Sequence, residues 1–247
     1  DLAENAQAAA SRVQQAFRCM EECLKLANSA NAAEVESLRY QTYSVAAKVI
    51  LGVSRDHAFL DQARLYLLVD CTLPIPEFSE RIAAVSQAGV DLIQIRDKNA
   101  DAATLLAYAN AAISNVDRKN TRVLLNDRVD VVAEGEAIAS ATQPSDQIAG
   151  VHLGQTDLSV RTSRRLMSAA KWIGLSTHDK EQVVHAATQD IDYIGCGPTF
   201  PSRTKSFDAF AGLDFLRQIA EVTSLPAFAI GGITVDNISS VLETGIR

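Results

Sequence analysis

The stretch from residue 193 to residue 205 has the residue types of an anion-binding loop. It begins apolar, breaks at Gly195, Gly197 and Pro198, and continues with hydroxyl and cationic side chains. Glycines leave backbone N–H groups accessible, and hydroxyls and cations bind phosphate oxygens. The sequence therefore predicts an anion cradle here, although an ordinary surface loop has the same composition. Its candidate ligands are Thr199, Ser202, Arg203, Thr204 and Lys205.

A second cluster of polar and cationic side chains lies at the end of the apolar stretch 90–95. Side chains alternate along a strand, so Gln94, Arg96 and Lys98 share one face while Ile95 and Asp97 point to the other. Two cations on one face suit a polyphosphate. A solvated strand end is the alternative.

Carboxylates follow two further apolar stretches. Asn126 and Asp127 end the stretch that begins near residue 122, and Asp157 follows the stretch 149–153. Carboxylate oxygens suit Mg²⁺, which needs only one or two of them when it also bridges phosphate oxygens. Asn126 and Asp127 fit a helix N-cap as well. His152 lies within its strand, which favours a hydrogen-bonded core histidine over a metal ligand.

Two more strand ends carry polar or flexible residues. Ser176 and His178 invite a nucleophile and base, but no G-x-S-x-G elbow surrounds them, so covalent catalysis is not expected. Gly231 and Gly232 precede a helix expected to start near Val235, where free N–H groups could bind phosphate. A tight turn accounts for the same glycines.

The elements that would position these residues begin after about residue 62. Residues 1–62 are poor in Gly and Pro and repeat apolar residues every three or four positions, which predicts two amphipathic helices in a hairpin. We interpret this segment as a packing or oligomerisation appendage. Cys19 and Cys23 lie four apart on it and are expected to be small core residues.

From residue 63 to residue 247 short apolar strands alternate with helices. This rhythm predicts a parallel sheet with crossover helices, and seven such units indicate a TIM (β/α)8-type barrel. The chain stops at residues 243–247, where the eighth strand is expected to begin, so the last strand is lacking in this chain. Strands are expected at 65–69, 90–95, 122–125, 149–153, 172–175, 193–195 and 227–230. Helices are expected near 78–88, 101–117, 129–140, 159–170, 180–189, 211–222 and 235–243.

Six of these segments together resemble thiamine-phosphate synthases, the enzymes that join the two halves of thiamine. The likeness covers residues 64–245 and follows the family's order at successive strand ends. The six segments are 94–98, 126–127, 151–157, 174–178, 193–205 and 229–234.

The resemblance implies a transferase with a role for each matched residue. Hydroxymethylpyrimidine diphosphate would be held by Gln94, Arg96, Lys98, Asn126, Ser176 and Lys205, with Arg96, Lys98, Ser176 and Lys205 acting in catalysis. Asp127 and Asp157 would hold Mg²⁺. Ser202, Thr204 and Gly232 would hold thiazole (or carboxythiazole) phosphate.

The family's reaction agrees with this set of residues. Diphosphate leaves a carbon attached to an electron-rich aminopyrimidine, the cation is delocalised, and the thiazole nitrogen then attacks. Such a dissociative substitution needs charge stabilisation and positioning rather than a nucleophilic side chain.

Several features depart from the family's pattern. Asp97 stands where Glu is usual, Ser202 replaces a Thr, and residues near 134–147 are an insertion. Residues 1–62 are not part of the usual enzyme. The last strand and its Val-Ser phosphate loop are absent, which puts thiazole phosphate binding in doubt.

Two other functions remain open. A thiazole tautomerase shares the barrel and the thiazole phosphate end of the site, but would not require Asp127, Asp157, Arg96 and Lys98 together. A non-catalytic barrel scaffold would show no Mg²⁺-dependent ligand binding.

Composition limits the setting and the partners. Hydrophobic residues at 47% suffice for a full core, and the net charge of −7 argues against general nucleic-acid binding. No apolar run approaches the ~20 residues of a membrane span. The four cysteines form no C-x-x-C pair, so a reduced, cytoplasmic setting is expected. The expected partners are small-molecule substrates, with self-association through the N-terminal helices.

Overall fold

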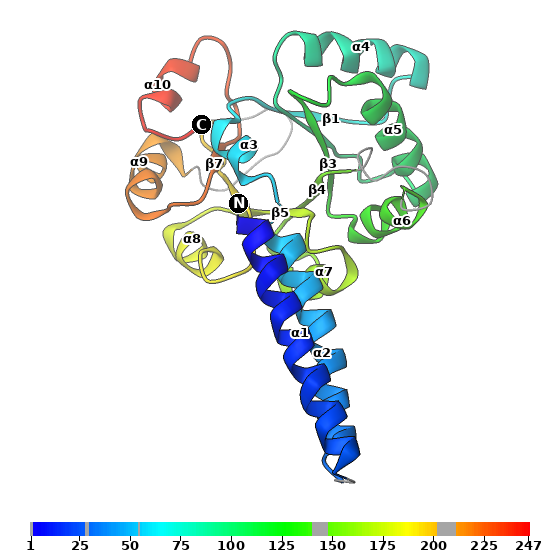
Figure 1. Ribbon diagram of the computed structural model, residues 1–247. Coiled ribbons are helices and arrows are strands. Elements are labelled where there is room, and N and C mark those ends of the chain that lie inside the picture. Colours follow the sequence, from blue (N-terminus) through cyan, green and yellow to red (C-terminus); the bar gives the residue numbers. More distant parts are fainter. Residues whose placement is uncertain (1, 28–29, 54, 140–147, 202–210) are drawn as a thin grey trace. The chain divides into compact units, whose positions relative to one another are not determined.

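The computed structural model describes residues 2–27, 30–53, 55–139, 148–201 and 211–247. The chain divides into two compact units (Figure 1). The first comprises residues 1–55 with residues 168–170, and the second comprises residues 56–167 and 171–247. No helix among the described residues is long and apolar enough to cross a membrane.

The first unit is the expected helical hairpin. Helix α1 spans Leu2–Leu26 and α2 spans Ala32–Val53. Between them Glu21 is 2% exposed, and it accepts hydrogen bonds from Lys25 Nζ and, at 2.7 Å, from Arg39 Nε. A buried carboxylate with two cationic partners favours one register of the two helices.

Two cysteines of this unit are not where the sequence analysis expected them. Cys19 and Cys23 share a face of α1, but both are exposed rather than part of the core. A two-helix hairpin has only one narrow buried seam, and that seam includes Glu21 and Val35 instead.

The second unit is a seven-stranded parallel sheet in which each strand pairs with the next strand in the chain. This order is that of a (β/α)8-type barrel, so the predicted fold class is confirmed for these seven strands. The strands are β1 Tyr66–Val69, β2 Leu92–Ile95, β3 Arg122–Asn126, β4 Gly150–Leu153, β5 Trp172–Thr177, β6 Tyr193–Cys196 and β7 Ala227–Ala229.

Helices separate the strands along the chain and flank the sheet (Figure 1). Several start at a side-chain cap, as when Asp101, Ser159 and Asp179 accept the backbone N–H three residues later. The helices are α3 His57–Gln62, α4 Ile75–Gln87, α5 Ala102–Asn115, α6 Val129–Ala139, α7 Val160–Leu166, α8 Lys180–Ala186, α9 Gly212–Val222 and α10 Ile238–Leu242.

Alternation along each strand creates two hydrophobic cores. One set of positions, such as Ile93 and Ile95, packs against the surrounding helices. The other set faces the inside of the sheet, where Tyr66 of β1 lies 5.4 Å from Phe228 of β7, centroid to centroid. The first and last strands thus approach each other, which means that the sheet curls. The inner core contains Leu60, Ala63, Leu92, Leu124, Trp172, Tyr193 and Phe228.

Helix α3 belongs to this second unit, whereas the sequence analysis placed residues 56–62 in the N-terminal segment. Its Leu60 is fully buried in the inner core, and Phe59 stacks on Trp172 at 5.9 Å. A six-residue helix with one buried side chain has too little periodicity to be assigned from sequence.

Arg247 forms backbone hydrogen bonds with β7 along the edge of this strand. Its N–H donates to Ala227 at 3.2 Å, its carbonyl accepts from Ala229 at 2.6 Å, and its side chain donates to the Leu60 carbonyl at 2.7 Å. Arg247 therefore pairs with β7 as a residue of a next parallel strand would, at the position where the sequence analysis expected the eighth strand to begin.

Candidate functional site

Two carboxylates face each other at the carboxyl ends of β3 and β4. Asp127 directly follows β3, and its N–H donates to the His152 carbonyl at 2.8 Å, which holds it against β4. Asp157 lies beyond β4, and its Oδ2 accepts the Gly154 N–H at 2.7 Å. The side chains of Asp127 and Asp157 interact directly, and Asn126 also hydrogen-bonds Asp127. The structure thus brings together three residues that the sequence analysis singled out.

The electrostatics of this pair favour a bound cation. Burial and the facing Asp157 raise the pKa of Asp127 to about 6, against the opposing effects of Asn126 and Lys98. Asp127 also adopts a left-handed backbone conformation, with φ of 60°, which is unusual for a residue other than glycine. Strained backbone and unfavourable charge in one residue are typical of positions kept for function.

Asp127→Asn is expected to stabilise the metal-free protein at neutral pH. The folded-state pKa of Asp127 is raised, so its ionisation destabilises the fold above pH 6, and this effect disappears as the pH falls from about 6 to about 4. Asparagine tolerates the same backbone conformation without the charge. With a chelator present, the melting temperature should rise by roughly 2–4 °C at pH 8 and by less at pH 5. Equal melting temperatures at pH 8 would contradict this assignment.

Two cations lie at the same end of the sheet as the two carboxylates. Lys98 acts electrostatically on Asp127, and Arg96 acts on His152, so both lie near the carboxyl ends of β2, β3 and β4. Arg96 is partly buried and Lys98 is exposed. The carboxyl end of the sheet therefore combines two carboxylates with two cations.

A chain of hydrogen bonds runs through the inner core below this cluster. Gln94 Nε2 donates to Tyr66 Oη at 2.7 Å, and Tyr66 Oη lies 2.8 Å from Tyr193 Oη. Tyr193 Oη lies 3.1 Å from His152 Nδ1, whose Nε2 lies 2.9 Å from Ser176 Oγ. The chain connects two predicted site residues, Gln94 and Ser176, through three that the sequence analysis had not assigned to the site.

The titratable side chains in this series of hydrogen bonds stay uncharged. Burial raises the pKa of Tyr66 to about 12 and that of Tyr193 well above its ordinary value. Burial, and next the Arg96 guanidinium, lower the pKa of His152 to about 4, although Asp157 opposes this. His152 is thus the buried, hydrogen-bonded histidine that the sequence analysis favoured.

Glycines make room for the two rings. A Cβ on Gly174 would lie 2.0 Å from Tyr193 Cζ, and one on Gly195 would lie 3.0 Å from His152 Cε1. Tyr193 is fully buried, so its ring has no space to yield. Gly174 and Gly195 were visible in the sequence, but their role depends on which ring fills the space beside them.

Ser176 does not pair with His178. Its partner is His152, while His178 Nδ1 contacts the Gly197 carbonyl. His178 was the histidine nearest to Ser176 in the sequence. Residues two apart at a strand end point to the same side of the sheet, but their side chains do not have to contact each other.

The glycine turn after β7 packs against the start of the predicted anion loop. The N–H of Phe200 donates to the Gly231 carbonyl at 3.0 Å, and a Cβ on Gly232 would lie 2.4 Å from the Pro201 carbonyl oxygen. Gly232 has a φ of 63°, which also favours glycine. The helix begins at Ile238 instead of near Val235, so the two glycines are not at its N-terminus.

The remaining loop candidates have different outcomes. Thr199 is buried and donates to the Ile230 carbonyl at 3.1 Å, so its hydroxyl has a structural partner. Ser202, Arg203, Thr204 and Lys205 lie outside the described residues.

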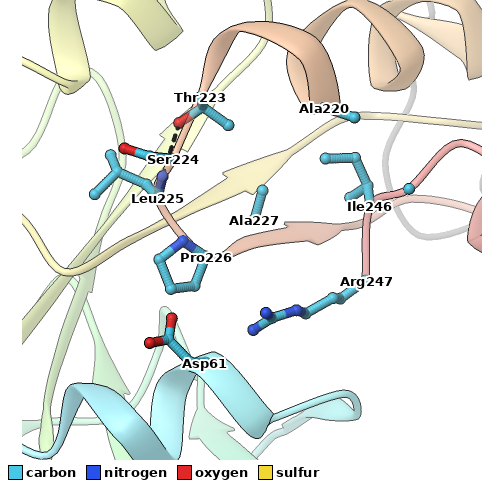
Figure 2. Close-up of a pocket in the computed structure, with 10 residues that line it drawn as sticks. Asp61, Ala220, Thr223, Ser224, Leu225, Pro226, Ala227, Ile246 and Arg247 are labelled. Atoms are coloured by element: carbon cyan, nitrogen blue, oxygen red, sulfur yellow. Dashed lines mark hydrogen bonds between the residues drawn. The ribbon is translucent and has the colours of Figure 1, made fainter.

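A hollow at the other end of the sheet contains none of the predicted site residues. It lies beside the start of β7, between Asp61 of α3 and Arg247 (Figure 2), and Thr223 to Pro226 form part of its wall. In barrels of this class the amino-terminal end of the strands serves stability, whereas active sites form at the carboxyl end. We therefore place the candidate site at the carboxyl end.

The residues present fit magnesium better than a tightly held structural metal. No three His, Cys, Asp or Glu side chains in the described part of the chain form a metal-binding group. Asp127 and Asp157 supply two hard oxygen ligands, and Mg²⁺ characteristically completes its shell with water and substrate phosphates.

Fold and site together define a (β/α)-barrel protein with charged and hydroxyl side chains gathered where enzymes of this fold have their active sites. The chain belongs to the thiamine monophosphate synthase family, whose model matches residues 65–247. This confirms the resemblance seen in the sequence. Residues 1–48 match a second model, that of the ThiD2 family.

Individual relatives agree with this assignment. The chain is 41% identical to the thiamine-phosphate synthase of Rhodopirellula baltica over its whole length, and 33% identical to that of Prochlorococcus marinus over 96% of its length. It spans 65% of the length of each of these relatives. Among solved structures, thiamine phosphate pyrophosphorylase from Pyrococcus furiosus is 27% identical, with a TM-score of 0.60, over 76% of this chain and 84% of that one.

Proposed function

We propose that this protein is a thiamine-phosphate synthase. It would condense hydroxymethylpyrimidine diphosphate with thiazole phosphate, to give thiamine phosphate and diphosphate, or with carboxythiazole phosphate, in which case CO2 is released as well. The observation that carries the proposal is the facing pair Asp127 and Asp157 beside Lys98 and Arg96, in a chain of this family. A tautomerase acting on thiazole phosphate alone would have no use for this set.

The chemistry follows from the charges of these side chains. When bound, Mg²⁺ supplies a Lewis acid that neutralises the diphosphate leaving group. Arg96 and Lys98 would stabilise the negative charge that accumulates as the carbon–oxygen bond breaks, and Ser176 would donate a hydrogen bond to the same group. Gln94 and Asn126 would orient the pyrimidine diphosphate. The acceptor nitrogen needs no activation, because the pyrimidine cation is a strong electrophile.

Some parts of the proposal concern residues outside the described range. Lys205 would add a third cation over the diphosphate, and Ser202 and Thr204 with Gly232 would bind the thiazole phosphate. The packing of Gly232 against Pro201 supports this, since it brings that turn next to the start of the loop. A cytoplasmic location and self-association through α1 and α2 also remain predictions. Exposed apolar side chains on the hairpin, including Val13, Met20, Val45 and Val49, favour the latter.

The test is formation of thiamine phosphate by the purified protein from both substrates, with and without Mg²⁺. We expect product only with Mg²⁺, together with one diphosphate released per thiamine phosphate. Each substrate alone serves as the control. Absence of product at saturating substrates and Mg²⁺ would overturn the assignment.

A further inference from the structure

The hydrogen-bond chain below the site has two possible proton orders. Each tyrosine hydroxyl and a neutral histidine ring carries one hydrogen for two neighbours. When each of these buried hydrogens is bonded to a neighbour in the series, reversing one bond reverses all the others. In one order hydrogens point from Gln94 toward Ser176. In the other they point from Ser176 toward Gln94.

The Gln94 end selects between these orders. Its Nε2 faces Tyr66 Oη at 2.7 Å, so Tyr66 receives a hydrogen there and uses its own toward Tyr193. Tyr193 then donates to His152 Nδ1, which leaves the histidine hydrogen on Nε2, pointing at Ser176 Oγ. Ser176 accepts that bond, and its own hydrogen is free.

We propose that Tyr66 and Tyr193 are positioning residues. Because Gln94 donates to Tyr66, the two tyrosines fix the direction of each later hydrogen bond as far as Ser176. They hold the proton of His152 on Nε2 and leave the Ser176 hydroxyl hydrogen available to an anionic ligand at the strand ends. The proton order depends only on the chain of contacts. That the ligand is a diphosphate rests on the proposed function.

The reversed order would give Ser176 a different chemistry. The Ser176 hydroxyl would donate its hydrogen to His152 Nε2. Only the lone pairs of Ser176 Oγ would then face the strand ends, and these repel an anion. A serine that donates to a histidine is also the arrangement of a nucleophile and its base. With the proton on Nε2, His152 cannot accept a proton from Ser176, so the proposed order excludes this activation. It agrees with the cations Arg96 and Lys98, which also suit an anion.

The packing supports a fixed order. Tyr193 and Phe228 meet edge to face at 5.7 Å, and Tyr66 and Tyr193 do so at 5.8 Å, so the rings have defined places. No buried side-chain nitrogen or oxygen in the described part of the chain lacks a hydrogen-bond partner. A rotated ring would leave such an atom, which is costly.

The direct test is the tautomer of His152 in the ligand-free protein. Nitrogen-15 NMR of labelled histidine distinguishes a protonated from an unprotonated ring nitrogen, and the other three histidines can be assigned by substitution. We expect His152 with the proton on Nε2. Gln94→Glu, which turns the first donor into an acceptor, should move the proton to Nδ1. Tyr193→Phe should leave a mixture of both tautomers.

Tyr108→Phe is the matched control. Tyr108 is also buried, and its hydroxyl donates to the Leu73 carbonyl away from the chain of contacts. This variant should keep the wild-type tautomer. Melting curves of all variants establish that they are folded.

Binding of inorganic pyrophosphate with Mg²⁺ gives the second measurement. Tyr193→Phe should weaken it by roughly two- to threefold, because only part of the protein then keeps the Ser176 donor, and Tyr108→Phe should not. A wild-type proton on Nδ1, or a His152 tautomer unaffected by Gln94→Glu, would overturn the inference. If the wild-type protein had the Nε2 tautomer but no synthase activity, the proposed function would be wrong and the inferred proton order would stand.

Discussion

Asp127→Asn is expected to reduce the rate of thiamine phosphate formation by roughly a thousandfold, equivalent to about 4 kcal/mol of transition-state stabilisation. The substitution keeps the size of the side chain and tolerates the φ of 60°. What it removes is one of the two charges that would hold Mg²⁺ beside the leaving group. The same change should raise the stability of the metal-free protein, so a loss of activity would not reflect unfolding.

Steady-state rates over a range of Mg²⁺ concentrations provide the measurement. Asp130→Asn is the control, because Asp130 is an exposed carboxylate on the following helix that pairs with Arg128 at 2.6 Å. It should retain wild-type activity. Asp127→Asn with a wild-type rate at low Mg²⁺ would show that Asp127 is not a ligand.

Gly174→Ala should destabilise the second unit by roughly 3 kcal/mol, at the upper end of the usual effect of overpacking. The new methyl group would overlap the buried ring of Tyr193, with 2.0 Å between Cβ and Cζ. Because Tyr193 bonds both Tyr66 and His152, its displacement would also break the hydrogen-bond chain. We expect a melting temperature lower by about 6–12 °C.

Gly135→Ala in α6 is the matched control. The nearest atom to a Cβ there would be the side-chain tip of Ile148, Cδ1, at 3.2 Å, with Leu106 Cδ1 in ordinary contact at 3.7 Å, and alanine favours helix over glycine. This variant should melt at the wild-type temperature or slightly above it. If Gly174→Ala melted there too, the ring of Tyr193 could not occupy the place assigned to it.

Much of the architecture could be predicted from the sequence. Short apolar stretches alternating with amphipathic ones predicted seven parallel strands, and the observed strands agree to within about two residues at most ends. Consecutive parallel strands place all their carboxyl ends on one side, so Arg96, Asp127 and Asp157 could be expected together without any knowledge of distances. Regular periodicity and chain direction are local properties, which is why sequence alone suffices for them.

Tertiary structure alone decided what lies inside the barrel. Tyr66 and Tyr193 are separated by 127 residues, and each looks in sequence like an ordinary apolar strand residue. Their hydroxyls meet because the sheet curls, and Gly174 leaves space for one ring. The exposure of Cys19 and the placement of α3 likewise depend on which face finds a neighbour. Contacts between distant strands depend on curvature and side-chain volume, and neither is encoded in the spacing of residues along one strand.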